Sequence, residues 1–103
     1  MEFTKEQKNE YLDELALATQ KDIWMSELAK LKNSEKLAKK KALLTVVEQK
    51  IEQKEYKSAR DGKNEKTQLE TDIANLESKI QEGDATIGLA NADLELIEEY
   101  RQK

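Results

Sequence analysis

The chain of 103 residues contains no cysteine, no histidine and no proline, and it has only three glycines. Without cysteine and histidine it can form no disulfide, has no thiol nucleophile and lacks the ligands that transition metals prefer. Without proline, no residue forces a long helix to end. Aromatic residues make up only 5% of the chain. These absences favour helical structure and exclude disulfides, thiol and histidine chemistry, and the usual transition-metal sites.

Long apolar runs are absent as well. No stretch approaches the roughly 20 apolar residues that a membrane-spanning helix needs. The polar start of the chain, residues 1–5, does not resemble a secretory signal. We therefore expect a cytoplasmic protein that has no contact with membranes.

What the chain does contain is typical of coiled coils. Alanine, glutamate, lysine, leucine and arginine account for 57 of the 103 residues. One apolar stripe then follows steps of four and three residues: Leu69, Ile73, Leu76, Ile80, Gly83, Ile87, Ala90, Leu94 and Ile97. Such spacing is the seam of a helix that packs along another helix. The predicted fold class is therefore all-α, a long antiparallel helical hairpin.

Helix boundaries follow from capping and turn residues. Thr4 and Gln7 fit a capping box, so a first helix is expected to begin near residue 5. The sequence around Gly62 predicts the hairpin loop, at residues 61–64, because glycine closes helices in the left-handed conformation. The expected helices are then about 5–33, 35–60 and 65–102, in one domain covering 1–103.

Two other positions leave the helix boundaries open. Asn33-Ser34 is a weaker candidate break, because both residues also occur inside helices at modest cost. Gly83 is interpreted as lying inside the last helix, since the seam continues in phase on both sides of it.

A loop at 61–64 fixes an expected pairing, in which the numbers of facing residues sum to about 125. Trp24 then lies beside Tyr100, and residues 3–21 extend past the end of the last helix. An isolated amphipathic helix of that length is marginal in water. We therefore expect a third helix at the base of the hairpin, supplied either by the chain's own bent N-terminus or by a second copy.

Apolar residues outside the seam indicate where this extra packing occurs. The expected oligomer or partner interface consists of Tyr11, Leu12, Leu15, Ile23, Trp24, Leu89, Leu96 and Tyr100. For Trp24 and Tyr100 the competing interpretation is core packing at the end of the bundle, which we favour because Trp24 is in phase with Leu28 and Leu31. The tip at residues 58–64 is a further candidate contact point.

The clusters of charged residues have simple interpretations. Residues 35–60 are basic and residues 61–103 are acidic, as expected of two helices that face each other. A possible basic patch, Lys36, Lys39, Lys40 and Lys41, could bind nucleic acid, but a solvated face opposite the acidic helix is favoured. The acidic group at 93–99 is spread around a helix, which does not suit a calcium site. No cofactor, metal site or catalytic residue is expected.

Two functional hypotheses remain. The first is a non-enzymatic protein interaction module, a coiled-coil adaptor or assembly protein that forms a homodimer or higher oligomer. The second is a small stoichiometric inhibitor or chaperone that binds a protein target through an amphipathic helical face. A compact acidic helical protein of this kind would suit an accessory factor encoded by a virus or mobile element.

Overall fold

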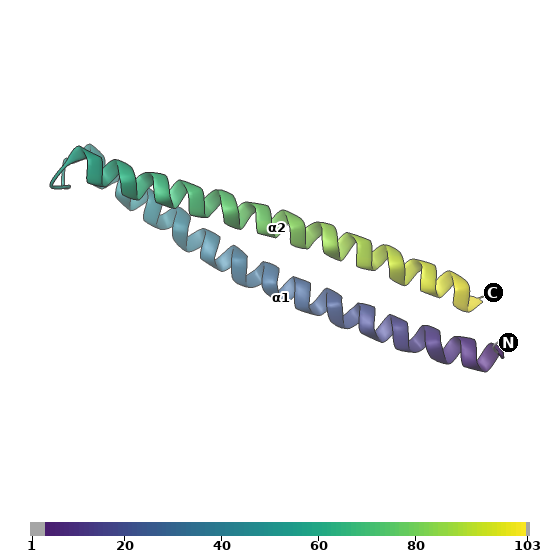
Figure 1. The fold of residues 1–103 in the computed structure, drawn as a ribbon. Coiled ribbons are helices and arrows are strands. Elements are labelled where there is room, and N and C mark those ends of the chain that lie inside the picture. The colour runs from purple at the N-terminus through teal and green to yellow at the C-terminus, as the bar shows by residue number, and fades with distance from the viewer. Residues whose placement is uncertain (1–3, 103) are drawn as a thin grey trace. The chain divides into compact units, whose positions relative to one another are not determined.

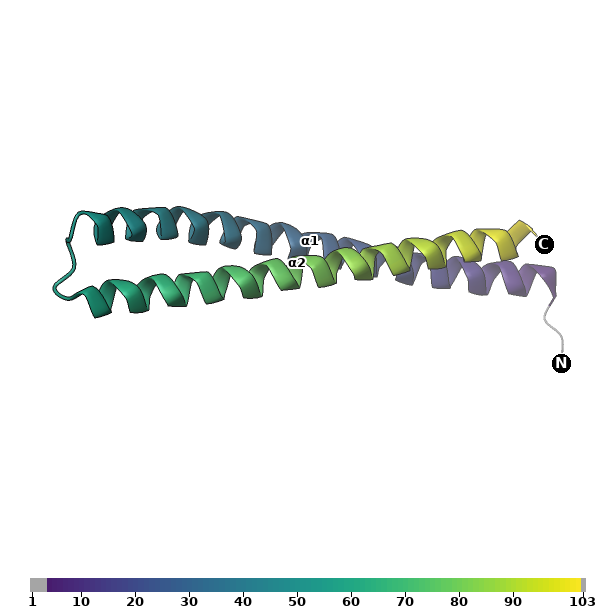
Figure 2. The same cartoon turned by 90° about the horizontal axis from the view of Figure 1, so that it is seen from above.

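The computed structural model describes residues 4–102, which form two α-helices joined by a short connection (Figures 1 and 2). Helix α1 spans Lys5–Glu52 and helix α2 spans Ala59–Gln102. The protein is thus an all-α helical hairpin, and the predicted fold class is confirmed. The chain divides into two compact units: unit 1, Met1–Ala29 with Glu82–Lys103, and unit 2, Lys30–Gln81.

Helix α1 begins where the capping box predicts. The backbone N–H of Gln7 donates to the Thr4 hydroxyl at 3.1 Å, and the Thr4 N–H donates to the Gln7 side chain at 3.0 Å. The helix then continues through Asn33-Ser34 without interruption, so the break considered there does not exist. No third helix forms from the N-terminal segment within residues 4–102, and that alternative is wrong.

The connection between the helices lies at residues 53–58, not at the predicted 61–64. Helix α1 ends in a Schellman motif, in which the Lys54 N–H donates to the Ile51 carbonyl and the Glu55 N–H donates to the Lys50 carbonyl. Lys54 holds the left-handed position, with a φ of 57°. Ser58 caps the N-terminus of helix α2, where its hydroxyl accepts the Asp61 N–H at 3.2 Å.

The loop prediction was wrong at Gly62 because this glycine is required for close packing and not for a turn. It lies inside α2 and is buried. A Cβ at this position would lie 2.9 Å from both Ile51 Cγ1 and Tyr56 Cδ2. Glycine is therefore needed here for the close approach of the connection and α1 to α2, and not for a turn.

The shifted turn changes the pairing of the helices. Within unit 2, Lys40 contacts Asp72 at 3.2 Å and Lys66 lies 3.9 Å from Glu48, so facing residues sum to about 112 to 114. Pairs built on a sum of about 125 are therefore wrong by nearly two heptads. The four-three seam of α2 repeats every seven residues, so more than one offset along α1 keeps this seam directed at the other helix. The turn, and not the seam, selects the register.

The register also removes the predicted N-terminal overhang. Within unit 1, the guanidinium of Arg101 in the last turn of α2 forms an ion pair with the Asp13 carboxylate. The first turns of α1 therefore lie alongside the last turns of α2. The expected pair of Trp24 with Tyr100 does not form, because Tyr100 lines a groove with Leu12 instead.

Each helix presents one inward stripe. On α2 the nine residues of the predicted seam are all buried or half-buried. On α1 the corresponding stripe is interrupted by polar residues and consists of Leu12, Ala16, Thr19, Ile23, Ser26, Lys30, Asn33, Leu37, Lys40, Leu44 and Val47. Leu28 and Leu31, which the sequence placed in the seam, are 45% and 58% exposed. The α1 seam is therefore less apolar than the stripe that faces water.

Substitution of the glycines separates their roles. Gly62→Ala is expected to destabilise the hairpin by about 1 kcal/mol, because overpacking costs about 1–3 kcal/mol and the gain in helix propensity returns only about 1. At Gly83 an added Cβ would have no atom within 4 Å, so Gly83→Ala should stabilise the hairpin by about 1 kcal/mol. Urea unfolding followed by circular dichroism measures both, and equal effects at the two sites would contradict the assigned role of Gly62.

Lys54 offers a second test of the turn. A lysine in the left-handed conformation costs about 1 kcal/mol that glycine avoids. Lys54→Gly should therefore raise the free energy of unfolding by about 1 kcal/mol, in the same urea experiment. Lys57→Gly, in the same connection but without a positive φ, is the control and should bring no gain.

Candidate protein interaction surfaces

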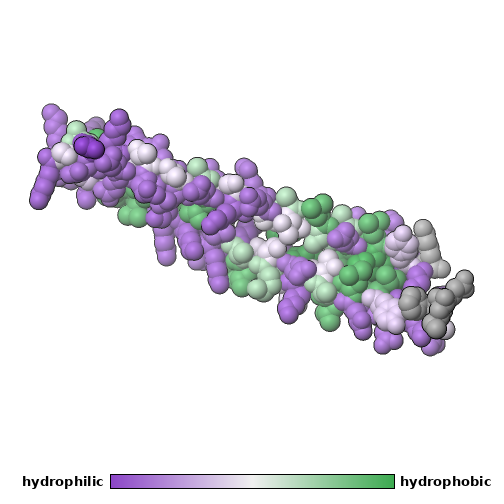
Figure 3. Space-filling view, viewed as in Figure 1, coloured by the Kyte–Doolittle hydropathy of each residue, from purple (hydrophilic) through white to green (hydrophobic). Residues whose placement is uncertain are grey.

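Exposed apolar side chains are the dominant surface feature of the described residues. Only Ile23, Val47, Leu69 and Ile97 are buried among the hydrophobic side chains of residues 4–102. The large exposed ones are Tyr11, Leu15, Leu17, Trp24, Met25, Leu28, Leu31, Leu43, Val46, Ile51, Leu89, Leu96 and Tyr100. Figure 3 shows hydrophobic residues gathered over the part of the chain that holds the termini, which is unit 1. Exposed apolar side chains gathered in this way make unit 1 the candidate contact surface of the molecule.

The first surface is a groove between the two helices of unit 1. Leu15 of α1 and Leu96 and Tyr100 of α2 line it, and each is about half exposed. Leu12 and Ile97 form its floor, and the groove has a volume of about 370 Å³. We call Tyr11, Leu15, Ala18, Leu96 and Tyr100 the flank surface. On α1 its members follow four-three spacing, one step around the helix from the seam.

The second surface lies on the outer side of α1 and uses a single helix. Leu17, Trp24 and Met25 line a shallow apolar hollow there, and these side chains are 60–73% exposed. Leu28 continues the same stripe one turn further on. We call Leu17, Trp24 and Leu28 the outer ridge; Met25, seven residues after Ala18, lies between this ridge and the flank surface. The interpretation of Trp24 as a core residue is wrong, because the better apolar stripe of α1 points away from α2.

The structure sorts the predicted interface residues into exposed and buried positions. Tyr11, Leu15, Trp24, Leu89, Leu96 and Tyr100 are exposed, and Leu12 is half-buried at the groove floor. Ile23 is 4% exposed and occupies the seam, so it cannot form part of an outer interface. Leu17 and Met25 were missed by the sequence prediction. The seven-residue spacing of Leu17, Trp24 and Leu31 is the signal that could have found them.

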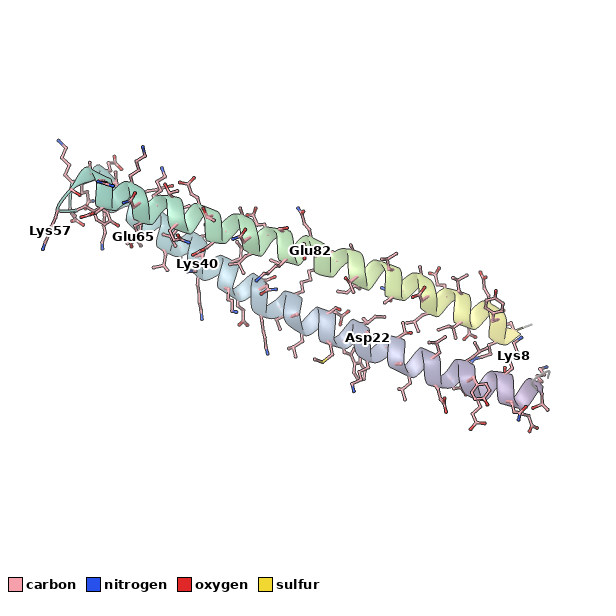
Figure 4. All side chains as sticks on the ribbon, in the orientation of Figure 1. Lys8, Asp22, Lys40, Lys57, Glu65 and Glu82 are labelled. Carbon is pink, nitrogen blue, oxygen red and sulfur yellow. The ribbon has the colours of Figure 1, made fainter. Side chains whose placement is uncertain are left out.

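The basic cluster takes part in pairing between the helices. Lys40 donates to Asp72 at 3.2 Å, and Lys41 lies 3.6 Å from Glu77 (Figure 4 labels Lys40). The hydrogen bond from Gln68 and the one from Lys40 together hold the pKa of Asp72 below its usual range. Two of the four lysines thus face acidic partners on α2. This pairing favours the solvated-face interpretation over a nucleic-acid site.

The tip of unit 2 has a hollow of about 380 Å³ beside the connection. Tyr56 packs into it against Gly62, and the Tyr56 hydroxyl donates to Glu65 at 2.8 Å. Partial burial and this bond to a carboxylate raise the pKa of Tyr56. The ammonium group of Lys50 lies 5.7 Å from the centre of the Tyr56 ring. These contacts explain how the connection is held, and they assign it no binding role.

No helix within residues 4–102 has an apolar stretch long enough to cross a bilayer. Within the same range, no three acidic, cysteine or histidine side chains gather closely enough to hold a metal ion.

Comparison with known proteins adds no assignment: no family model, curated protein or solved structure matches the chain. The surfaces themselves therefore carry the functional argument.

The hydrogen bonds that Asp72 accepts from Gln68 and Lys40 make the stability of the hairpin depend on pH. Because the folded pKa of Asp72 is lowered, its contribution is present above the unfolded value near 4 and is lost as the pH falls through the folded value. Asp72→Asn should therefore lower the melting temperature at pH 7 and leave it nearly unchanged near pH 2. Glu70→Gln, an exposed position on the same helix, is the control. An equal loss at both pH values would contradict the ionic origin of the effect.

Proposed function

We propose that this protein is a non-enzymatic interaction module that self-associates through the flank surface and presents the outer ridge to a protein partner. The observation that carries the proposal is the exposure of large apolar side chains on two separate sides of unit 1. The chain as a whole carries a net charge of −4 and 39% charged residues, so these apolar surfaces stand out from a polar background.

The small apolar area that the seam buries in unit 1 supports packing against a further helix pair. A hairpin of two helices buries a single seam, and here three of the five α1 seam residues within unit 1 are small or polar: Ala16, Thr19 and Ser26. Apolar burial contributes about 25 cal/mol per Å², so a seam of this kind stabilises two helices weakly. Covering the flank surface with another helix pair would enlarge the core at the place where the seam is weakest.

In the proposed mechanism, self-association orders unit 1. The outer ridge then exposes Trp24 and its neighbours to a protein partner on a rigid helix. Exposed tryptophan with flanking aliphatic residues is the usual composition of an anchor at protein interfaces. The inhibitor or chaperone hypothesis uses the same ridge in a monomer, as an amphipathic helix that enters a groove of its target.

Sedimentation equilibrium of paired variants tests the proposal. The double variant Leu15→Ser with Leu96→Ser should raise the dissociation constant of self-association more than about thirtyfold, since each buried leucine contributes about 1–2 kcal/mol. Its helix content should stay within a few per cent of the parent, because both side chains lie outside the seam. Leu12 is unsuitable for this purpose, since it also packs in the hairpin.

Leu43→Ser provides the matched control. Leu43 lies on α1 four heptads after Leu15, at the same heptad position and with a similar exposure of 51%, but in unit 2. Its substitution should leave self-association within about twofold. A parent chain that sediments as a monomer at 100 µM would refute the self-association and leave the monomeric inhibitor hypothesis standing.

A further inference from the structure

The α1 side chains before and after Leu15 differ in charge and size, along the flank surface and at its ends. On α1, Leu15 lies midway between Lys8 and Asp22, seven residues from each, and all three share one heptad position. Tyr11 and Ala18 lie on the adjoining position, four residues before and three residues after Leu15. Charge and size are therefore opposite on the two sides of Leu15: a cation and a large side chain before it, a small side chain and an anion after it.

A twofold axis through Leu15 brings the side chains before Leu15 in one copy against those after Leu15 in the other copy, and the two sets are complementary in charge and size. We propose that two copies of the chain pack flank surface on flank surface, antiparallel, with α1 on α1 and α2 on α2 of the partner copy. Lys8 of each copy then faces Asp22 of the other, about 10 Å along the helix from Leu15. Tyr11 lies against the small Ala18, and Leu15 meets its own symmetry mate. The inference rests on the self-association proposed above and specifies its geometry.

Helix α2 fits the same axis. The residue of α2 that lies across from Leu15 is near position 98, midway between Leu96 and Tyr100, which line the same groove as Leu15. An axis at this level places Leu96 of one copy against Tyr100 of the other, twice per dimer. Two large apolar pairs thus extend the contact on α2, and the interface is isologous, as in most homodimers.

Charge distinguishes this arrangement from the other symmetric one. If both hairpins pointed the same way, α1 would lie on α2 of the second copy, with Leu15 against Leu96. Asp22 would then face the apolar Leu89, and Asp93 would face Ala18. Each mismatch leaves a carboxylate against an apolar neighbour, which is costly. In the antiparallel arrangement Asp22 instead meets Lys8, and Figure 4 shows both of these residues on α1.

Engineered cysteines test the geometry directly, because the chain has no cysteine of its own. A residue on a twofold axis meets its own copy, so Leu15→Cys should form an intermolecular disulfide under mild oxidation, within the Cα separation of about 4.4–6.8 Å that disulfides need. Leu43→Cys, at the same heptad position in unit 2, should give at least tenfold less dimer at equal concentration.

Charge exchange provides a second measurement that does not depend on disulfide geometry. Lys8→Glu or Asp22→Lys alone should raise the dimer dissociation constant about tenfold at low salt, because each change affects two symmetric pairs. The double variant should return to within about threefold of the parent, and the single-variant penalty should shrink at 1 M salt.

The outcomes separate the two proposals. Cross-linking of Leu15→Cys alone, with rescue in the double charge variant, supports the antiparallel dimer. A disulfide that forms only in a mixture of Leu15→Cys and Leu96→Cys would overturn this geometry in favour of hairpins pointing the same way, while self-association would stand. Dimers in which neither variant cross-links and neither charge change matters would place the interface elsewhere. A monomeric parent would overturn both proposals.

Discussion

The seam on α2 is the constraint on which the rest of this hairpin depends. Its members recur at four-three spacing from Leu69 to Ile97, and this spacing keeps one face of a long helix directed at a neighbour. Helix α1 supplies a weaker stripe, with Lys40 and Asn33 among its inward positions. The hairpin is therefore held by one strongly apolar helix and one helix that contributes pairing charges as much as apolar area.

The weak inward stripe of α1 goes together with the apolar residues that this helix exposes to solvent. Helix α1 has two stripes in its first half, and the one that faces α2 contains Thr19 and Ser26, while the one that faces water contains Leu17, Trp24 and Leu28. A helix that turned its most apolar side inward would place these three residues in the seam. The observed arrangement instead leaves them accessible to solvent, and this exposure is the observation on which the proposed interaction module rests.

Much of the fold could be predicted from sequence because it depends on local and repetitive signals. The capping box at Thr4 and the α2 seam are of this kind, and both are present as predicted. The register could not be predicted, because a seven-residue repeat is satisfied by several offsets and only the turn distinguishes them. The turn itself was misplaced because Lys54, a residue that rarely takes the left-handed conformation, holds the position expected for Gly62. The error in register then carried Trp24 into a core to which it does not belong.

The outward position of Trp24 gives the molecule a built-in optical probe. It is the only tryptophan in the chain, and 64% of its surface is in water. Indole emission shifts with the polarity around the ring, so any molecule that covers the outer ridge changes the fluorescence of this single side chain. Contacts confined to the flank surface or the tip leave that signal nearly unaltered. One unlabelled residue thus distinguishes which side of α1 is occupied.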